Sequence, residues 1–406
     1  MILSEKSKNK IKDIRATAFE WVVIIFYALV VGTMGGVVGS AFARSLSFVT
    51  ELRAEHSWII YLLPVGGLVS VLIYKLTKTE GISTDRALEA STGTVRMPAR
   101  ITPVIFAATT ITHLLGGSAG KEGAALQVGS GVAELVSKLT RADEKKRAIL
   151  AVCSMAAVFS AMLGTPVAAC VFALEVAVIG RINSRAFFPA LLSSITAHFI
   201  SLALGVVPER FHIDIVPALD IMVLLKTAVI ALAVSVIAGI FCHMISGGHK
   251  LAEKAVKNPF ARIFAGGCII IVLTLIFGTD YNGGGIFVIE RIFEEASVRP
   301  EAFLLKIIFT VITISAGFKG GEIVPSFFIG STLGAVLSAV MGLPIGFCAA
   351  IGMTAFFSAA TNCQIASAVI AVEFFGTDGF IYFAVAAFAS RIFFRNTSLY
   401  QAQKHI

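Results

Sequence analysis

The sequence predicts an all-α, polytopic membrane protein made of two related halves whose helices are broken within the membrane. The 406 residues are 57% hydrophobic and only 14% charged, with a mean hydropathy of +0.88, whereas soluble proteins carry about 25% charged residues. Trp58–Tyr74 and Ile323–Val372 contain no charge at all. Several apolar runs approach the ~20 residues that cross a bilayer, and others are shorter or interrupted by glycine and proline. We expect no sizeable soluble domain at either end.

The first half is predicted at residues 18–207, after a basic amphipathic segment at residues 1–17. Ala148–Gly180 is too long for one span, and Gly164-Thr165-Pro166 breaks it because proline cannot continue a helix. A polar interval at residues 75–100 separates the second and third apolar runs. The expected runs of this half are Trp21–Leu46, Trp58–Tyr74, Ile101–Leu115, Val132–Leu139, Ala148–Gly180 and Ala186–Val207.

The second half is predicted at residues 218–395, between a linker at residues 208–217 and a polar tail at residues 396–406. The linker contains Pro208, Pro217 and several charges, which suit an irregular connection. The expected apolar runs are Ile221–Ile240, Ile263–Gly278, Ile286–Ile289, Ala302–Ala316, Ile323–Val340, Gly346–Phe357, Ile365–Phe375 and Phe380–Phe394.

The net charge of +8 is concentrated in three places that are expected to face the cytoplasm. The positive-inside rule assigns Lys- and Arg-rich connections to that side, and with them the N-terminus of a protein in the cell membrane. The N-terminal segment has no signal-peptide cleavage site, so we expect it to remain as a helix on the membrane surface. The clusters are Lys6, Lys8, Lys10, Lys12 and Arg15; Lys138, Arg141, Lys145, Lys146 and Arg147; and Lys250, Lys254 and Lys257.

Cysteine and histidine patterns give no sign of a metal site, a disulfide framework or a cofactor. The six cysteines lie within or beside apolar runs without CxxC spacing, and the seven histidines are scattered. No nucleophile motif or nucleotide-binding loop is present, so we expect neither enzyme activity nor a cofactor. The basic residues are placed for membrane topology, so we expect the bilayer as partner and no nucleic acid.

The most informative stretch is residues 116–131, GGSAGKEGAALQVGSG. Glu122 stands there between apolar runs, where a charged side chain costs roughly 2.5–3.5 kcal/mol or more and is a functional candidate by default. The glycines permit a tight turn, and from Gly123 onward the residues resemble the start of a new helix. A helix N-terminus attracts an anion, and the Glu122 carboxylate would compete for the same place. The alternative is that Lys121 and Glu122 pair with each other, or that the loop lies at the surface.

A comparison of the chain with itself supports two homologous halves. Gly117, Gly120 and Glu122 recur 200 positions later as Gly317, Gly320 and Glu322. Transporters built from inverted repeats bring broken helices together near the midplane, with N-termini pointing at an anionic substrate. A second set recurs 198 positions later: Met155, Phe159, Ser160, Ala161, Ala168 and Glu175 match Met353, Phe357, Ser358, Ala359, Ala366 and Glu373.

These residues resemble the CLC family of chloride channels and proton-coupled anion antiporters. Gly120-Lys121-Glu122-Gly123 is similar to the family's G-K/R-E-G-P motif, with Ala124 where proline is usual. Gly321-Glu322-Ile323-Val324-Pro325 stands in place of its G-x-F-x-P motif, and Tyr400 falls where the inner-gate tyrosine belongs. The resemblance implies a homodimer with one anion pathway in each subunit and Glu122 as external gate and proton carrier. It also implies anion-binding roles for Gly120, Lys121, Gly123, Ile323, Val324 and Tyr400.

Departures from the family pattern are similar to those of its bacterial fluoride/proton antiporters. The string G-S-G-I-P is absent, and Gly81-Ile82-Ser83 is the nearest candidate for that anion-binding loop. Val176 stands where conventional antiporters carry an internal proton-transfer glutamate, while Glu322 adds a carboxylate beside the expected anion path. We therefore expect Glu322 to take the inner proton-handling role, with a structural role as the alternative.

Three further residues have structural alternatives. Glu175 and Glu373 end the same apolar run in each half, and a capping or pairing role is favoured over a catalytic one. Tyr400 is interpreted as a gate, although an interfacial aromatic residue is the alternative.

Three function classes follow: proton-coupled anion antiport, a passive anion channel, or a membrane-embedded enzyme. The absence of catalytic motifs weighs against the enzyme. The expected function is exchange of fluoride for protons, leading to fluoride export, and the alternative is a chloride/proton antiporter or a passive channel.

Overall fold

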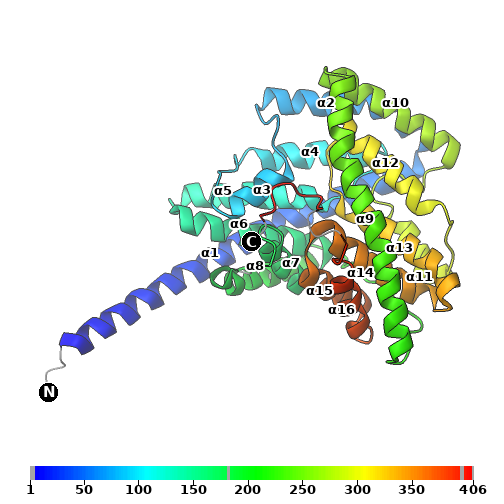
Figure 1. Ribbon diagram of the computed structural model, residues 1–406. Helices are drawn as coiled ribbons and strands as arrows, with labels where there is room; N and C mark the ends of the chain where they lie inside the picture. The colour runs from blue at the N-terminus through cyan, green and yellow to red at the C-terminus, as the bar shows by residue number, and fades with distance from the viewer. Residues whose placement is uncertain (1–4, 181–182, 394–396, 405–406) are drawn as a thin grey trace.

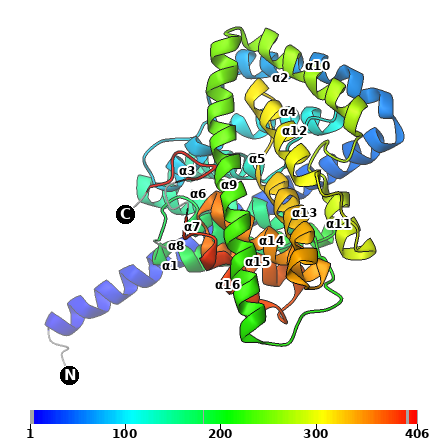
Figure 2. The same ribbon diagram turned by 45° about the vertical axis from the view of Figure 1, so that its right-hand side comes forward.

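The structure is a computed structural model that describes residues 5–180, 183–393 and 397–404, with side chains from Trp21 onward. These residues form helices α1–α16 and one short 3₁₀ helix, and no strand is assigned among them. Figures 1 and 2 show the helices gathered into one body, with the beginning of α1 projecting from it. Within the described part, seven helices are long and apolar enough to cross a membrane. An all-α membrane fold is thereby confirmed.

Most helices of the predicted first half lie on the expected runs, with α1 as the main exception. The break at Gly164-Thr165-Pro166 is confirmed, because Gly164 adopts a left-handed φ of 74° and Pro166 starts the next helix. A Cβ on Gly164 would also collide with Pro208. The helices are α1 Glu5–Glu55, α2 Leu63–Leu76, α3 Thr84–Ser91, α4 Ile101–Leu114, α5 Glu122–Leu139, α6 Glu144–Leu163, α7 Pro166–Glu175 and α8 Ser184–Ala203, with the 3₁₀ helix at Ser57–Leu62.

The helices of the predicted second half are joined to the first by an irregular stretch, as expected for the linker. Residues 206–220 contain no helix. The helices are α9 Ile221–Ala255, α10 Pro259–Phe277, α11 Ile286–Glu295, α12 Ala302–Ala316, α13 Ile323–Met341, α14 Ile345–Thr361, α15 Gln364–Phe375 and α16 Phe380–Ala389. Residues 394–396, where this half is predicted to end, lie outside the described residues.

Helix α1 differs from its prediction at both ends. The backbone of residues 5–17 runs without a break into the first span, so the expected separate surface helix is not a separate element. At the other end the helix continues past Leu46 to Glu55. It contains no proline, the residue that would oblige it to stop at either place. The side chains of the basic N-terminal residues lie outside the described part.

Two glycine-lined seams hold the centre of the protein together. Helix α5 packs on α6 where a Cβ on Gly129 would lie 2.8 Å from the Met155 Cα. Helix α13 packs on α14 in the same way, because a Cβ on Gly330 would lie 2.9 Å from the Met353 Cα. Small residues let helix backbones approach closely in membranes. Gly129 and Gly330 hold the same place in the two seams. A residue of α5 therefore corresponds to the residue of α13 that lies 201 positions later.

Glu175 and Glu373 cap helices of opposite halves. The Glu175 carboxylate accepts hydrogen bonds from the backbone N–H groups of Ile365 (3.2 Å) and Ala366 (2.8 Å), at the start of α15. Glu373 accepts from Val167 (3.1 Å) and Ala168 (2.8 Å), at the start of α7. Each carboxylate satisfies N–H groups that a helix leaves unpaired at its N-terminus. This reciprocity gives both residues the structural role favoured from the sequence, and it supports the prediction of two related halves.

Candidate anion and proton site

The two glycine loops that carry the repeated glutamates are paired backbone to backbone. Gly120 and Gly321 exchange two N–H···O=C hydrogen bonds of 2.6 and 2.7 Å. No side chain fits between the loops, because a Cβ on Gly321 would lie 2.5 Å from the Gly123 nitrogen. The pairing brings the N-termini of α5 and α13 together in the interior, as expected for broken helices in a repeat-built transporter.

Glu122 is the first residue of α5, one position earlier than the predicted helix start, and its side chain is fully buried. Its Oε2 accepts a hydrogen bond from the Lys121 backbone N–H at 3.0 Å. Its Oε1 has no hydrogen-bond partner among the described residues. A buried carboxylate oxygen left unpaired is costly. Glu122 therefore occupies the place at the helix N-terminus where an anion is favoured, held by one hydrogen bond through Oε2.

Lys121 does not pair with Glu122 as the alternative interpretation proposed. Its Nζ lies 2.7 Å from Oε1 of Glu209, which belongs to the linker between the predicted halves. The loop is also buried rather than at the surface. Both forms of the alternative are therefore wrong, and the Glu122 carboxylate forms no ion pair with a lysine side chain among the described residues.

A first cavity, called the outer cavity, opens on the Lys121 side of Glu122. Its volume is about 280 Å³, and Gly120, Lys121 and Val324 line it. Glu209 and Glu290 line it as well, together with Arg53. Carboxylates and cations therefore share this surface.

A second cavity, called the inner cavity, lies on the other side of the paired loops. Its volume is about 510 Å³, and Gly81, Ile82, Ser83, Glu322 and Tyr400 all line it. These residues come from three distant parts of the chain, and the structure brings them together around one cavity. Gly81-Ile82-Ser83 stands directly before α3, whose first residue is Thr84. Glu122 lies between the two cavities.

The polar groups around the inner cavity are incompletely paired. The Tyr400 hydroxyl is buried and has no hydrogen-bond partner among the described residues. The same is true of Oε1 of Gln127, whose Nε2 donates to the Thr84 hydroxyl at 3.2 Å. Thr84 in turn donates to the Gly123 carbonyl at 3.3 Å. Tyr400 is therefore a buried donor at the cavity rather than an interfacial aromatic residue.

Glu322 lies directly before α13 and reaches toward the other loop. Its Oε2 would lie 3.4 Å from a Cβ placed on Gly123. The two carboxylate-bearing residues are therefore neighbours across the paired loops, with Glu322 lining the inner cavity and Glu122 buried behind it. Two predicted anion-binding residues, Gly123 and Ile323, line neither cavity.

Two lysines near the site were missed by the sequence analysis, one partly buried and one fully buried. Lys319 lines the inner cavity, and its Nζ lies 4.7 Å from the centre of the Tyr74 ring. Lys306 is fully buried and donates to the carbonyls of Tyr281 (3.1 Å) and Gly283 (2.7 Å). The rule that singled out Glu122, a charge inside an apolar run, applies equally to both lysines.

The family model described as voltage gated chloride channel matches residues 65–395. The chain belongs to this family. It is 32% identical over 388 residues to the "Chloride/fluoride channel protein" of Pseudomonas syringae pv. tomato, covering 92% of this chain and 84% of that protein. It is 25% identical over 391 residues to the "H(+)/Cl(-) exchange transporter ClcA" of Salmonella schwarzengrund, covering 86% of this chain and 80% of the relative.

Among solved structures, this chain is similar to one described as "a CLC-type fluoride/proton antiporter". The TM-score is 0.91 at 32% identity, with 96% of this chain and 99% of the other covered. The CLC fold expected from the two glutamate loops is thus confirmed over nearly the whole chain.

Proposed function

We propose that this protein exchanges fluoride for protons across the cell membrane and thereby exports fluoride. The observation that carries the proposal is Glu122: a buried carboxylate at a helix N-terminus, between two cavities, with one oxygen unpaired. The likeness to a fluoride/proton antiporter and to a chloride/fluoride channel protein supports fluoride as the anion.

Exchange follows from competition for one place. When charged, the Glu122 carboxylate is attracted to the N-terminus of α5 and blocks the anion from it. When it takes up a proton this attraction weakens, the side chain can leave, and fluoride can occupy the site. The return of the side chain then requires departure of the anion. Proton and anion movement are thereby linked through one group.

Glu322 serves as the inner proton station in this proposal. It lines the inner cavity beside Gly123 and can meet a proton from that side before Glu122 does. Val176 has no ionisable group to offer at the conventional position. A neutral Glu322 can also donate a hydrogen bond to a bound anion, whereas its charged form repels one.

Fluoride is small and strongly hydrated, so its pathway must replace water with close donors. The Tyr400 hydroxyl and the unpaired N–H groups at the starts of α5 and α13 are such donors. Gly81, Ile82, Ser83, Gly120, Lys121, Gly123, Ile323 and Val324 are proposed to complete the anion path. An inward proton gradient would then drive fluoride out.

The assembly and orientation complete the proposal. We infer a homodimer with one pathway per subunit, two halves related as inverted repeats, and an N-terminus in the cytoplasm. The basic connection between α5 and α6 supports the orientation through the positive-inside rule.

The proposal is tested in liposomes loaded with equal fluoride and chloride, with both anions and protons followed together. Fluoride is expected to leave much faster than chloride, accompanied by proton uptake. Equal efflux of both anions with protons coupled would identify a chloride/proton antiporter instead. Anion movement without protons would identify a passive channel.

A further inference from the structure

One face of α5 is polar from the site to the other end of the helix. Gln127, Ser130, Glu134 and Ser137 are spaced three, four and three residues apart, which places them on one side of a helix. All four are buried. We call this set the serine face.

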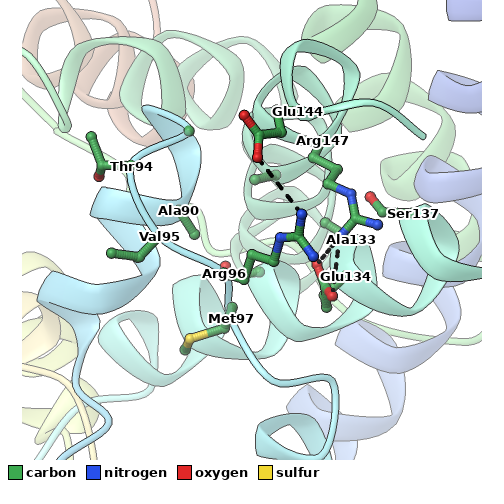
Figure 3. Close-up of a pocket in the computed structure, with 13 residues that line it drawn as sticks. Ala90, Thr94, Val95, Arg96, Met97, Ala133, Glu134, Ser137, Glu144 and Arg147 are labelled. Carbon is green, nitrogen blue, oxygen red and sulfur yellow. Dashed lines mark hydrogen bonds and ion pairs between the residues drawn. The ribbon is translucent and has the colours of Figure 1, made fainter. Parts of the chain in front are cut away.

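A third cavity lies against the serine face, at the end of α5 that joins the basic connection. Its volume is about 180 Å³, and its walls come from α3, the loop after it, α5 and α6. Figure 3 shows Arg147 and Glu134 on one wall, with Arg96 reaching toward Glu144 across the opening. Ser130 and Ser137 line the cavity from α5. We call it the side cavity.

The two arginines and two glutamates that line the side cavity are paired with one another. Arg147 Nη1 lies 3.2 and 3.3 Å from the two carboxylate oxygens of Glu134, and Lys138 Nζ lies 3.6 Å from the same carboxylate. Arg96 Nη2 lies 3.7 Å from Glu144. A small anion would have to compete with these carboxylates for the arginines, so the side cavity is a poor place to hold fluoride.

The hydroxyl groups of the serine face have no partner in the described protein. Ser130 Oγ and Ser137 Oγ lie in side chains that are each 1% exposed, yet neither makes a hydrogen bond there, and Oε1 of Gln127 is in the same condition. Buried groups of this kind in a polar cavity are ordinarily satisfied by water.

The corresponding helix α13 shows the opposite arrangement. At the shift of 201 residues, Ser331 and Ser338 stand in the places of Ser130 and Ser137. Ser331 donates to the Phe327 carbonyl at 2.8 Å and Ser338 to the Ala335 carbonyl at 2.6 Å, so both are satisfied by their own helix. Phe328 and Ala335 replace Gln127 and Glu134. Only the α5 side of this matched pair carries a polar face with free hydroxyls.

The serine face extends from the inner cavity to the side cavity. Gln127 lines the inner cavity together with Glu322, and Ser130 lines the side cavity. The two residues are three positions apart, about 4.5 Å along the helix. Two or three water molecules bonded to these groups would bridge that distance.

We propose that water enters through the side cavity, follows the serine face, and gives protons a route to Glu322 apart from the opening that the anion uses. The proposal rests on the proposed fluoride/proton exchange. It supplies what Val176 cannot, a polar passage from the basic side of the protein to the inner carboxylate. Hydroxyl, amide and water groups can pass a proton, whereas the balanced ion pairs at the mouth disfavour passage of the anion.

The test places a cysteine on the serine face and probes it with silver ion, a thiol reagent small enough for a water path. Ser130→Cys and Ser137→Cys are made in a Cys242→Ala, Cys268→Ala background, because Cys242 lines the inner cavity and Cys268 is exposed. Ser331→Cys in the same background is the matched control. Proteoliposomes in chloride-free fluoride buffer receive silver on the basic side, and silver binding to the protein and proton uptake are both measured.

We expect silver to bind at positions 130 and 137 and to slow proton uptake at least fivefold, while the Ser331→Cys protein behaves as the background does. Positions 130 and 137 as unreactive as position 331 would overturn the water path. Silver binding with unchanged proton uptake would overturn its role as the proton route. A background protein that moves fluoride without protons would instead contradict the proposed exchange, and silver binding would still decide whether water reaches the serine face.

Discussion

Two pairs of repeated glutamates behave in opposite ways in this protein. Glu175 and Glu373 are used identically: each accepts two backbone hydrogen bonds, of 2.8 and 3.1–3.2 Å, from the first turn of a helix in the other half. Glu122 and Glu322 are used differently. Glu122 is sealed inside with one oxygen unpaired, whereas Glu322 lines the inner cavity.

The contrast separates architecture from transport. Where both halves need the same contact, the reciprocal caps fix α7 and α15 at the centre and leave no group free to move. Where the halves diverge, Glu122 has an unpaired oxygen and Glu322 lines the inner cavity, and the proposed exchange depends on these two features. The same divergence distinguishes the serine face of α5 from the satisfied serines of α13.

The largest effect is expected for Glu122→Gln. The amide keeps the shape of the side chain but cannot carry the proton, so fluoride-driven proton uptake should fall at least tenfold, to background. Proton flux measured in liposomes decides the outcome. A mutant that retains the parental proton rate would remove Glu122 from the mechanism.

A smaller, several-fold change is expected for Glu322→Gln. The inner station is lost while Glu122 remains, so fewer protons should move per fluoride ion. The measurement is the fluoride-to-proton ratio under one fluoride gradient. An unchanged ratio would make Glu322 structural and equal in kind to Glu175.

Glu175→Gln and Glu373→Gln should act on stability alone and to the same extent. Each replaces one accepting oxygen by an NH₂ group that faces a backbone N–H, at a cost of about 1–3 kcal/mol. Thermal unfolding in detergent should show two similar decreases with a normal fluoride-to-proton ratio. Unequal decreases, or a changed ratio, would break the symmetry on which the comparison depends.

The smallest effect is expected at the start of α6, which has a side-chain cap that the start of α14 lacks. Asp143 caps α6 by accepting from the Lys146 backbone N–H at 2.9 Å, whereas α14 follows Pro344 and has no side-chain cap. Asp143→Ala should lower the free energy of unfolding by about 1 kcal/mol. Pro344→Ala removes no side-chain cap, so no such loss from capping is expected there.

The Asp143 effect should depend on pH. The hydrogen bonds from the Lys146 backbone and side chain lower the pKa of Asp143 below its ordinary value. A lowered pKa in the folded state gives stability that is present above the unfolded pKa, about 3.9, and is lost as pH falls through the folded pKa. The mutant and parental melting temperatures should therefore converge in acid, and a constant difference down to low pH would contradict the cap.

Local chemistry made part of this arrangement predictable. The break before Pro166 and the capping role of Glu175 follow from proline geometry and from a charge at the end of an apolar run. The pairing of the two glutamate loops follows from the repeat, because like sequences in an inverted pair meet at their shared axis.

Other contacts could not be predicted because they join residues that no local pattern connects. The Lys121–Glu209 ion pair spans 88 positions, and the sequence offered Lys121 no partner other than Glu122, as the alternative interpretation. The continuation of α1 to Glu55 lacked a stop signal to place its end. The serine face is spelled out in the sequence, but only the structure distinguishes its free hydroxyls from the satisfied ones of α13.

The proposed exchange is tested most directly by measuring proton movement against a pH gradient in liposomes, with an opposing fluoride gradient as the sole driving force. An antiporter in which Glu122 exchanges places with the anion must move protons uphill under fluoride and stop when the fluoride gradient is removed. Fluoride flow that leaves the pH gradient to decay at the rate of empty liposomes would contradict it and show a passive fluoride channel.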